Sequence, residues 1–355
     1  MDIFTQDNTG KIRALQGARF LFFVLIYMSH CATPRVTVPF DFGGESGVAF
    51  FFMLSGFVLS WGYGPSVSRG EFDHRRFFWR HLGKLFPLHL LLFAIVYMLD
   101  LRIGIHHDWT QTMTSLLLIQ SWIPCNHTLY TVNAVSWFLC DTIFFYAIFP
   151  WLYRRLIHAD VRRIVIWFAV FAAVYCLVAL RLPDGMVNCT LYANPLLRSV
   201  DFGMGIMVYR IYKTGFVKCH MAALPLAMSV LMLVATCCVY WHLPCGIRCA
   251  ALFWPVMPVA LLQMVASNDS RHDLVARVLG SRPMVWLGGI SFEAFMSHPL
   301  VMRVVQHFIG LDGTWRGDMV YFAISLVATM FAAYLLHVIF VKPVANVINS
   351  HLLRL

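Results

Sequence analysis

Long apolar stretches recur along the whole chain and constrain its fold more than any other feature. Each is roughly 20 residues long, the length that an α-helix needs to cross the hydrocarbon core of a bilayer. The stretches are 12–32, 43–62, 85–101, 134–153, 164–182, 195–212, 222–241, 248–267, 284–305 and 318–341. Only 12% of the residues are charged and 60% are hydrophobic, whereas an ordinary soluble domain has roughly 25% charged residues. We therefore predict an all-α, polytopic membrane helix bundle of about ten transmembrane helices.

The basic residues between these stretches predict an orientation. Most of the 27 lysines and arginines fall in every second connecting segment, as expected where those segments face the cytoplasm. Both chain termini are then cytoplasmic. The net charge of +10 is spread over short clusters, so we expect the lipid bilayer as a partner and no nucleic acid. A short apolar stretch at 113–123 is expected at the membrane interface, and residues 1–355 are expected to form one integral membrane domain.

Neither a cleaved leader nor a metal site is expected from the sequence. The first apolar stretch is too long for the core of a typical leader, and no small-residue cleavage site follows it. The ten cysteines show no zinc-ligand spacing. Cys125 and Cys189 both fall in predicted outer segments, which leaves a disulfide between them as an open alternative.

Arg19 and His30 lie on the first apolar stretch. Eleven helical steps separate them, which is about three turns and about 16 Å, so both side chains lie on one face of the helix. Ionisable groups inside a membrane are expensive and commonly functional. Histidine can also take and return a proton near neutral pH. The spacing therefore indicates a site of proton chemistry at His30, although a histidine at a helix end would explain it as well.

Four more ionisable residues on other stretches are expected at a similar depth in the outer half of the membrane. They are Glu45, Asp141, Arg198 and His298. Such residues are expected to converge on a hydrated cavity, because lipid would reject each of them alone. Structural explanations stay open: His298 precedes Pro299 and can bond the backbone carbonyl that a proline frees.

The acidic residues have further alternatives. Asp141 can pair with Arg198 or with a histidine, and Glu45 and Arg198 can contact headgroup water. Glu293 lies in the middle of the ninth stretch, and we expect a buried partner for it, with Arg19 as a candidate.

Basic residues gather just before the third apolar stretch. They are His74, Arg75, Arg76, Arg80, His81 and Lys84. One interpretation is a cytoplasmic loop that follows the positive-inside rule. The other is an anion site, because arginine forks and lysine charges suit phosphates such as those of coenzyme A.

Five phrases in the chain carry a family resemblance. They are the Arg19 to His30 spacing, GVAFFFMLSGF at 47–57, RHLGKLFP at 80–87, SWFLCDTIFFYAIFP at 136–150 and GGISFEAFMSHP at 288–299. In this order they resemble the acyltransferase-3 superfamily of integral membrane acyltransferases, from about residue 10 to about residue 340. Thr142 departs from the pattern where relatives often carry glutamate, and His81 and Lys84 replace a pair of arginines.

The resemblance implies transfer of an acyl group, most often acetyl, from cytoplasmic acyl-CoA to a carbohydrate hydroxyl outside a plasma (bacterial inner) membrane. We expect His30 as general base, Asp141 to orient it, and His298 to hold the acceptor or polarise the oxyanion. An acyl-histidine intermediate on His30 is an alternative route. Acyl-CoA is expected at Arg19, Arg76, Arg80 and Lys84. The expected acceptor contacts are Glu45, Ser55, Trp137 and Arg198.

Two other classes of protein fit the buried polar residues. A proton-coupled secondary transporter also places His, Asp, Glu and Arg inside a bundle, but no inverted repeat is visible in the sequence. A membrane receptor or scaffold would leave the convergent ionisable residues unexplained. Consumption of a thioester distinguishes the acyltransferase from both.

Overall fold

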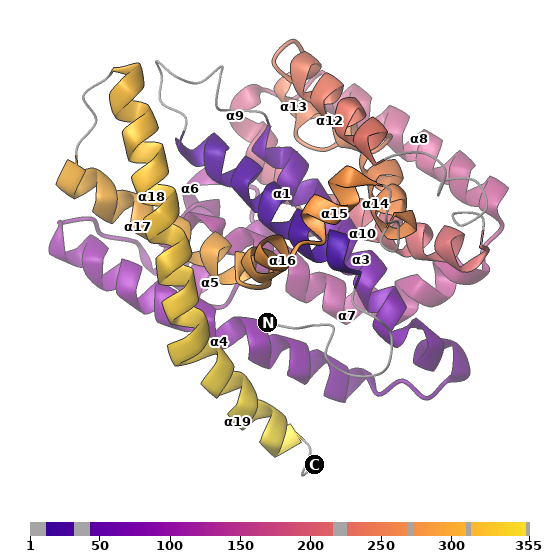
Figure 1. Cartoon of the computed structure of the whole chain (residues 1–355), viewed down its shortest axis with the longest axis horizontal. Coiled ribbons are helices and arrows are strands. Elements are labelled where there is room, and N and C mark those ends of the chain that lie inside the picture. Colours follow the sequence, from indigo (N-terminus) through magenta and orange to yellow (C-terminus); the bar gives the residue numbers. More distant parts are fainter. Residues whose placement is uncertain (1–11, 32–42, 216–225, 268–272, 310–313, 353–355) are drawn as a thin grey trace.

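Helices form all the regular structure in the described part of the chain, which confirms the all-α prediction (Figure 1). The computed structural model describes residues 12–31, 43–215, 226–267, 273–309 and 314–352. The long helices are α1 (Arg13–Cys31), α3 (Gly44–Arg69), α4 (His74–Arg102), α7 (Trp137–His158), α8 (Val161–Ala179), α10 (Pro195–Lys213), α17 (Ser291–Ile309) and α18 (Trp315–Leu336). Both termini lie outside the described residues, so their cytoplasmic location stays a prediction.

Short elements connect and cap the long helices. They are α5 (Trp109–Leu116), η1 (Gln120–Trp122), α6 (Asn126–Leu129), η2 (Ala134–Ser136), α9 (Asp184–Val187), η3 (Asn188–Tyr192), α12 (Ala227–Tyr240), α13 (Cys245–Arg248), η4 (Ala251–Phe253), α14 (Met257–Ala266), α15 (Leu274–Leu279) and α16 (Arg282–Gly289). The apolar stretch at 113–123 falls on α5 and η1, which are too short to span a bilayer.

Six helical segments of the described chain are long and apolar enough to cross a membrane: Arg13–Cys31, Gly44–Arg69, His74–Arg102, Ala134–His158, Val161–Ala179 and Arg316–Ile348. The predicted number of about ten is not reached on this criterion. The stretch 248–267 is divided between α13, η4 and α14, and 284–305 is interrupted at Ile290 between α16 and α17. These short helices pack against the long ones and do not form separate straight spans.

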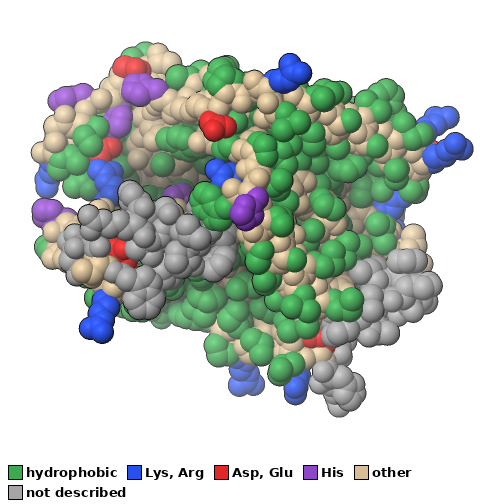
Figure 2. Space-filling view, turned by 90° about the horizontal axis from the view of Figure 1, so that it is seen from above, with side chains coloured by type: hydrophobic (Ala, Val, Ile, Leu, Met, Phe, Trp, Pro, Cys, Tyr) green, Lys and Arg blue, Asp and Glu red, His purple; other side chains and the backbone are tan. Residues whose placement is uncertain are grey.

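Apolar side chains cover the outside of the bundle. On α8, Trp167 is 73% and Leu177 is 66% exposed, and on α18 Val327 is 69% exposed. Figure 2 shows apolar side chains across the middle of one face and most of the basic side chains toward its edges. Exposed apolar surface on this scale is expected where lipid covers it. The chain is therefore a multi-pass membrane protein.

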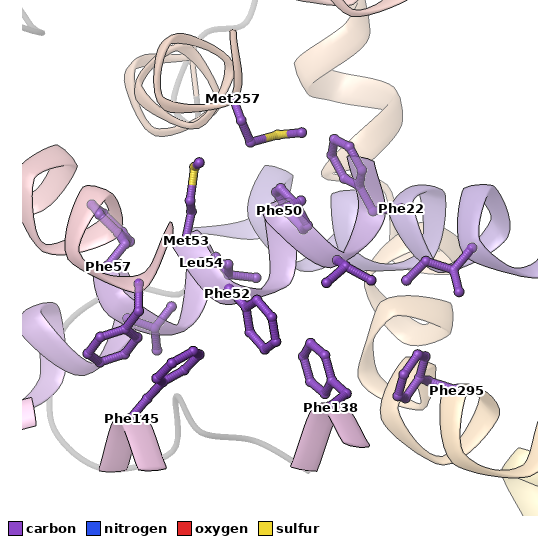
Figure 3. Close-up of a cluster of buried hydrophobic side chains, with 14 of the residues drawn as sticks. Phe22, Phe50, Phe52, Met53, Leu54, Phe57, Phe138, Phe145, Met257 and Phe295 are labelled. Carbon is purple, nitrogen blue, oxygen red and sulfur yellow. The ribbon is translucent and has the colours of Figure 1, made fainter. Parts of the chain in front are cut away.

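Helix α3 lies at the centre of the bundle, against α1, α7, α10 and α14. Its phenylalanines meet Phe138 and Phe145 from α7 on one side and Met257 from α14 on the other (Figure 3). Helices α3 and α10 approach each other closely, because a Cβ added to Gly56 would overlap the carbonyl oxygen of Phe202. Small residues allow this approach between membrane helices, so Gly56 fixes how the LSGF phrase seats in the fold.

The basic residues before the third stretch belong to α4 and not to a loop. The helix begins at His74, where the carboxylate of Asp73 accepts a hydrogen bond from the backbone N–H of Arg76 at 2.9 Å. An N-cap of this kind stabilises a helix start and explains why the helix extends beyond the apolar stretch. Since Arg76, Arg80 and Lys84 are four residues apart, they form one stripe along α4.

Candidate active site

His30, near the C-terminal end of α1, lies against His298 in the first half of α17. Their rings meet edge to face, with the centroids 4.9 Å apart. His30 is exposed, whereas His298 is fully buried, beside the rings of Phe23, Tyr27 and Phe295. The prediction that these two side chains converge is therefore matched by their geometry. We call them the histidine pair.

Backbone carbonyls fix the orientation of both rings. Nδ1 of His30 lies 2.8 Å from the carbonyl oxygen of Ile26, and Nδ1 of His298 lies 2.7 Å from that of Phe295. A carbonyl can only accept, so in the neutral form Nδ1 carries the proton and Nε2 presents its lone pair. Pro299 explains the second contact, because its missing N–H frees the carbonyl of Phe295 four residues earlier. The structural alternative for His298 is thus present, and it leaves Nε2 available.

Nε2 of His298 has no hydrogen-bond partner among the described residues, although it is buried. Buried polar atoms are normally paired, and exceptions call for an explanation. A lone pair held in this way can accept a hydrogen bond from a substrate hydroxyl. In this tautomer it cannot donate to an oxyanion, so the geometry favours holding the acceptor over polarising the oxyanion.

A narrow cavity lies deeper in the bundle, around Arg19. We call it the inner cavity; it has a volume of about 80 Å³ and its polar lining residues are Arg19, Ser55, His81, Thr142, Tyr146 and Ser291. Arg19 is 8% exposed, and its NH1 lies 3.4 Å from the Oε1 of Gln16. The hydroxyl of Ser55 donates to the carbonyl of Phe51 at 2.8 Å. Arg19 and Ser55 were predicted to contact different substrates, and the structure brings them to one cavity.

The basic stripe of α4 lies beside His81, a residue of the inner cavity lining. Arg76 is exposed, while Arg80 and Lys84 are half-buried. His81, on the adjoining face, is 1% exposed, and its Nδ1 lies 2.8 Å from the carbonyl oxygen of Phe77. Of these α4 residues, His81 is the one that lines the inner cavity. The sequence indicated the charge but did not place His81 in the cavity lining.

Aromatic rings separate the inner cavity from the histidine pair. Phe138 and Phe295 line the cavity, and their ring centroids are 5.2 Å apart. The ring of Phe295 is also 5.9 Å from that of His298. Figure 3 shows these two rings next to each other beside α3. Phe295 therefore lies between the inner cavity and His298, and we call Phe138 and Phe295 the aromatic layer.

Arg198, Asp201 and Asp141 form a second buried polar group, which we call the arginine cluster. All three are at most 1% exposed. NH1 of Arg198 lies 3.1 Å from the Oδ2 of Asp201 and donates to the carbonyl of Cys249 at 3.2 Å. Its guanidinium also lies over the ring of Phe52, 5.1 Å from the centroid. Contact of Arg198 with headgroup water is therefore excluded.

Asp141 belongs electrostatically to the arginine cluster. Arg198 and Asp201 are the charged groups that act on its carboxylate. Neither carboxylate oxygen has a hydrogen-bond partner among the described residues. Asp141, which was expected to orient His30, therefore accepts no hydrogen bond from its ring in this structure. Of the two alternatives for Asp141, the structure favours Arg198.

The remaining predicted contacts have other environments. The carboxylate of Glu45 accepts a hydrogen bond from the hydroxyl of Tyr240 at 2.6 Å. Trp137 is 4% exposed, and its ring lies 4.8 Å from that of Tyr192. Glu293 has the buried partner that was expected, because its Oε1 lies 2.8 Å from the Nδ1 of His337, while its pairing with Arg19 stays a prediction.

The disulfide that the sequence left open is absent. Cys125 and Cys189 are both free thiols among the described cysteines. Cys125 is exposed and Cys189 is buried, which is the usual environment of an inert, structural thiol.

Comparison with known proteins identifies the class. Residues 12–338 match the protein family described as an acyltransferase domain, so the chain belongs to the acyltransferase-3 family. A particular relative is the acyltransferase MdmB of Streptomyces mycarofaciens, 29% identical over 327 residues, which cover 84% of this chain and 81% of that protein. No solved structure matches. The chain is thus a membrane acyltransferase.

Proposed function

We propose that this protein transfers an acyl group, most simply acetyl, from cytoplasmic acyl-CoA to a carbohydrate hydroxyl at the outer face of a plasma (bacterial inner) membrane. The observation that carries the proposal is the histidine pair, because α1 and α17 present two imidazoles at one end of a membrane acyltransferase. An aqueous hydroxyl can reach the exposed ring of His30.

In this proposal the acyl transfer takes place at the histidine pair. Nε2 of His30 takes the proton from the acceptor hydroxyl while that oxygen attacks the thioester carbonyl carbon. The carbon–sulfur bond then breaks, and the imidazolium returns the proton to the departing thiolate. The products are an ester and free coenzyme A. Such positioned proton transfer typically contributes about 10²–10⁴-fold in rate.

The remaining residues have supporting roles in this proposal. The lone pair of His298 accepts a hydrogen bond from a second hydroxyl of the acceptor and so holds the reacting hydroxyl beside His30. Arg76, Arg80 and Lys84 bind the phosphates of coenzyme A, for which a stripe of cations is suited. Arg19 and Ser55 guide the pantetheine arm through the inner cavity. The aromatic layer of Phe138 and Phe295 must open for the thioester to reach His30.

Sidedness in sealed vesicles tests this function. Radiolabelled acetyl-CoA is supplied on one face of oriented proteoliposomes and a candidate glycan on the other. We expect labelled glycan on the far side and free coenzyme A on the near side. If acetyl-CoA is not consumed while a proton gradient drives solute uptake, the protein is a transporter and the proposal is wrong.

A further inference from the structure

A cleft opens at the outer end of the bundle, beside the histidine pair. We call it the outer cleft; its volume is about 370 Å³, within the range of roughly 300–1,000 Å³ that is typical of small-molecule sites. Its walls come from the end of α4, the turn after it, the segment at 130–134 and α17. Its lining includes Asp100, His107, Tyr130, Asn133, Leu300 and Arg303. The sequence pattern did not single out any of them.

Three charged or titratable side chains meet in the outer cleft, two from the end of α4 and the turn after it and one from α17. NH2 of Arg303 donates to the Oδ1 of Asp100 at 2.6 Å, and the Nε2 of His107 lies 2.9 Å from the Oδ2. Asp100 is 3% exposed, whereas the side chain of Arg303 is 37% exposed. The carboxylate is thus turned inward, and the guanidinium edge is open to the cleft. Since the two charges cancel, the cleft presents hydrogen-bond donors without a strong net charge.

Tyr130 adds an aromatic side chain to the lining of the outer cleft. It is 36% exposed, and Tyr97, outside the lining, places its ring 6.0 Å from that of His107. Desolvation and then the carboxylate of Glu45 raise the pKa of the Tyr130 phenol. Its hydroxyl therefore stays protonated and able to donate at neutral pH. Planar polar groups beside an aromatic face suit a ring that carries several hydroxyls and apolar C–H surface.

The segment at 130–134 is held in an unusual conformation. Val132 has a φ of 58°, which is unfavourable for a β-branched residue. The side-chain amide of Asn133 donates to the carbonyl of Met296 at 3.1 Å. That bond ties the cleft wall to α17 two residues before His298. Backbone strain of this kind concentrates at functional sites.

The outer cleft and the histidine pair share one stretch of α17. Pro299 and Leu300 line the cleft and directly follow His298. We propose that the outer cleft is the acceptor site and takes a neutral, polyhydroxylated ring, with Arg303 and Tyr130 as its hydrogen-bond donors and Nδ1 of the neutral His107 ring as an acceptor. This proposal rests on the proposed function, because it names the substrate class and the specificity-determining residues of the same reaction.

Filling the outer cleft with a larger side chain tests whether it is the acceptor site. Wild-type protein and Leu300→Trp are placed in lipid nanodiscs, since sugar-based detergents would compete for the site. Methyl α-D-glucopyranoside is the neutral probe and glucose 6-phosphate the charged one, and binding is followed by saturation-transfer difference NMR. Val304→Trp is the matched control, because Val304 lies on the same helix and is 43% exposed. Acetyl-CoA binding is measured on the same samples by calorimetry.

We expect the glucoside signal to fall at least about fivefold in Leu300→Trp and in Arg303→Lys, which keeps the charge but loses the planar fork. Val304→Trp is expected to match wild type, and acetyl-CoA affinity is expected to stay within about twofold in every variant. Three results would overturn the cleft assignment. They are no glucoside signal in wild type, equal glucoside signals in wild type and Leu300→Trp, and stronger binding of glucose 6-phosphate than of the glucoside. Glucoside binding without any acetyl-CoA binding would instead contradict the proposed function.

Discussion

The histidine pair and the arginine cluster lie in the same bundle and were both predicted for the outer half of the membrane, but they differ in what their side chains can still do. In the histidine pair, a backbone carbonyl lies against Nδ1 of each ring, and the ring of His30 is exposed. In the arginine cluster, Arg198 is fully buried against Asp201, a carbonyl and an aromatic face. Depth in the membrane therefore does not separate a reactive group from a structural one. The exposure of His30, which Arg198 lacks, does.

The largest expected effect is on the rate of acyl transfer, when His30 is replaced. We expect His30→Ala to lower the rate of acyl transfer by about 10²–10⁴-fold, because it removes the general base. Acetyl-CoA affinity and the free energy of unfolding are expected to change little, since the ring is exposed. Initial rates with radiolabelled acetyl-CoA and equilibrium unfolding in mixed micelles measure these quantities.

His307→Ala is the control for His30. His307 is an exposed histidine in the last turn of α17, and its replacement should leave the rate within about twofold. If His30→Ala retains wild-type transfer, the histidine pair is structural and the contrast with the arginine cluster disappears.

The next largest effect is on stability, at Arg198. We expect Arg198→Met to lower the free energy of unfolding by about 3–5 kcal/mol, because it leaves Asp201 as an uncompensated buried charge. The double variant Arg198→Met with Asp201→Leu should recover at least about half of this loss, since both charges are then gone. Equilibrium unfolding by denaturing detergent checks both.

Arg154→Met controls for the loss of an arginine. Arg154 is exposed near the end of α7, so we expect a change within about 0.5 kcal/mol. A stable Arg198→Met variant with a strongly raised KM for the acceptor would show that Arg198 binds substrate, as the sequence first indicated, and would weaken the structural interpretation.

The grouping of the polar residues was harder to predict than the helices. Apolar length predicted the helices, and ideal helical rise placed His30 and His298 at matching depths. Depth is one coordinate, whereas the direction in which a side chain points depends on the partner helix. Arg198 faces Phe52 of α3, which its own sequence context does not reveal. The Arg198 to Asp201 spacing was nevertheless a usable signal, because residues three apart on a helix are neighbours.

The outer cleft illustrates the limit of local patterns. Asp100, His107 and Arg303 come from the end of one helix, a turn and a helix about 200 residues later. Their contact depends on the packing of α4 against α17. No spacing rule for a single helix or loop joins such residues, so only the tertiary structure brings them together.

A smaller effect is expected at Trp254, which supports the arginine cluster. Its indole N–H donates to the Oδ1 of Asp201 at 2.8 Å. Trp254→Phe keeps an aromatic ring but removes this bond to a buried carboxylate, which is typically worth about 1.5–3 kcal/mol. Trp286→Phe, at a position that is 52% exposed, should change the free energy of unfolding by less than about 0.5 kcal/mol. Equal losses in both variants would show that Asp201 does not depend on the indole N–H.

The smallest expected effect decides to which group Asp141 belongs. Its carboxylate is acted on by Arg198 and has no hydrogen-bond partner among the described residues. We therefore expect Asp141→Asn to lower kcat by less than about tenfold and to leave the pH profile of kcat/KM unmoved. A carboxylate that stabilised the imidazolium of His30 would raise the pKa of that histidine, and its removal would shift the acid limb of the profile to lower pH. Such a shift would join Asp141 to the histidine pair, and the two polar groups would then form one catalytic unit.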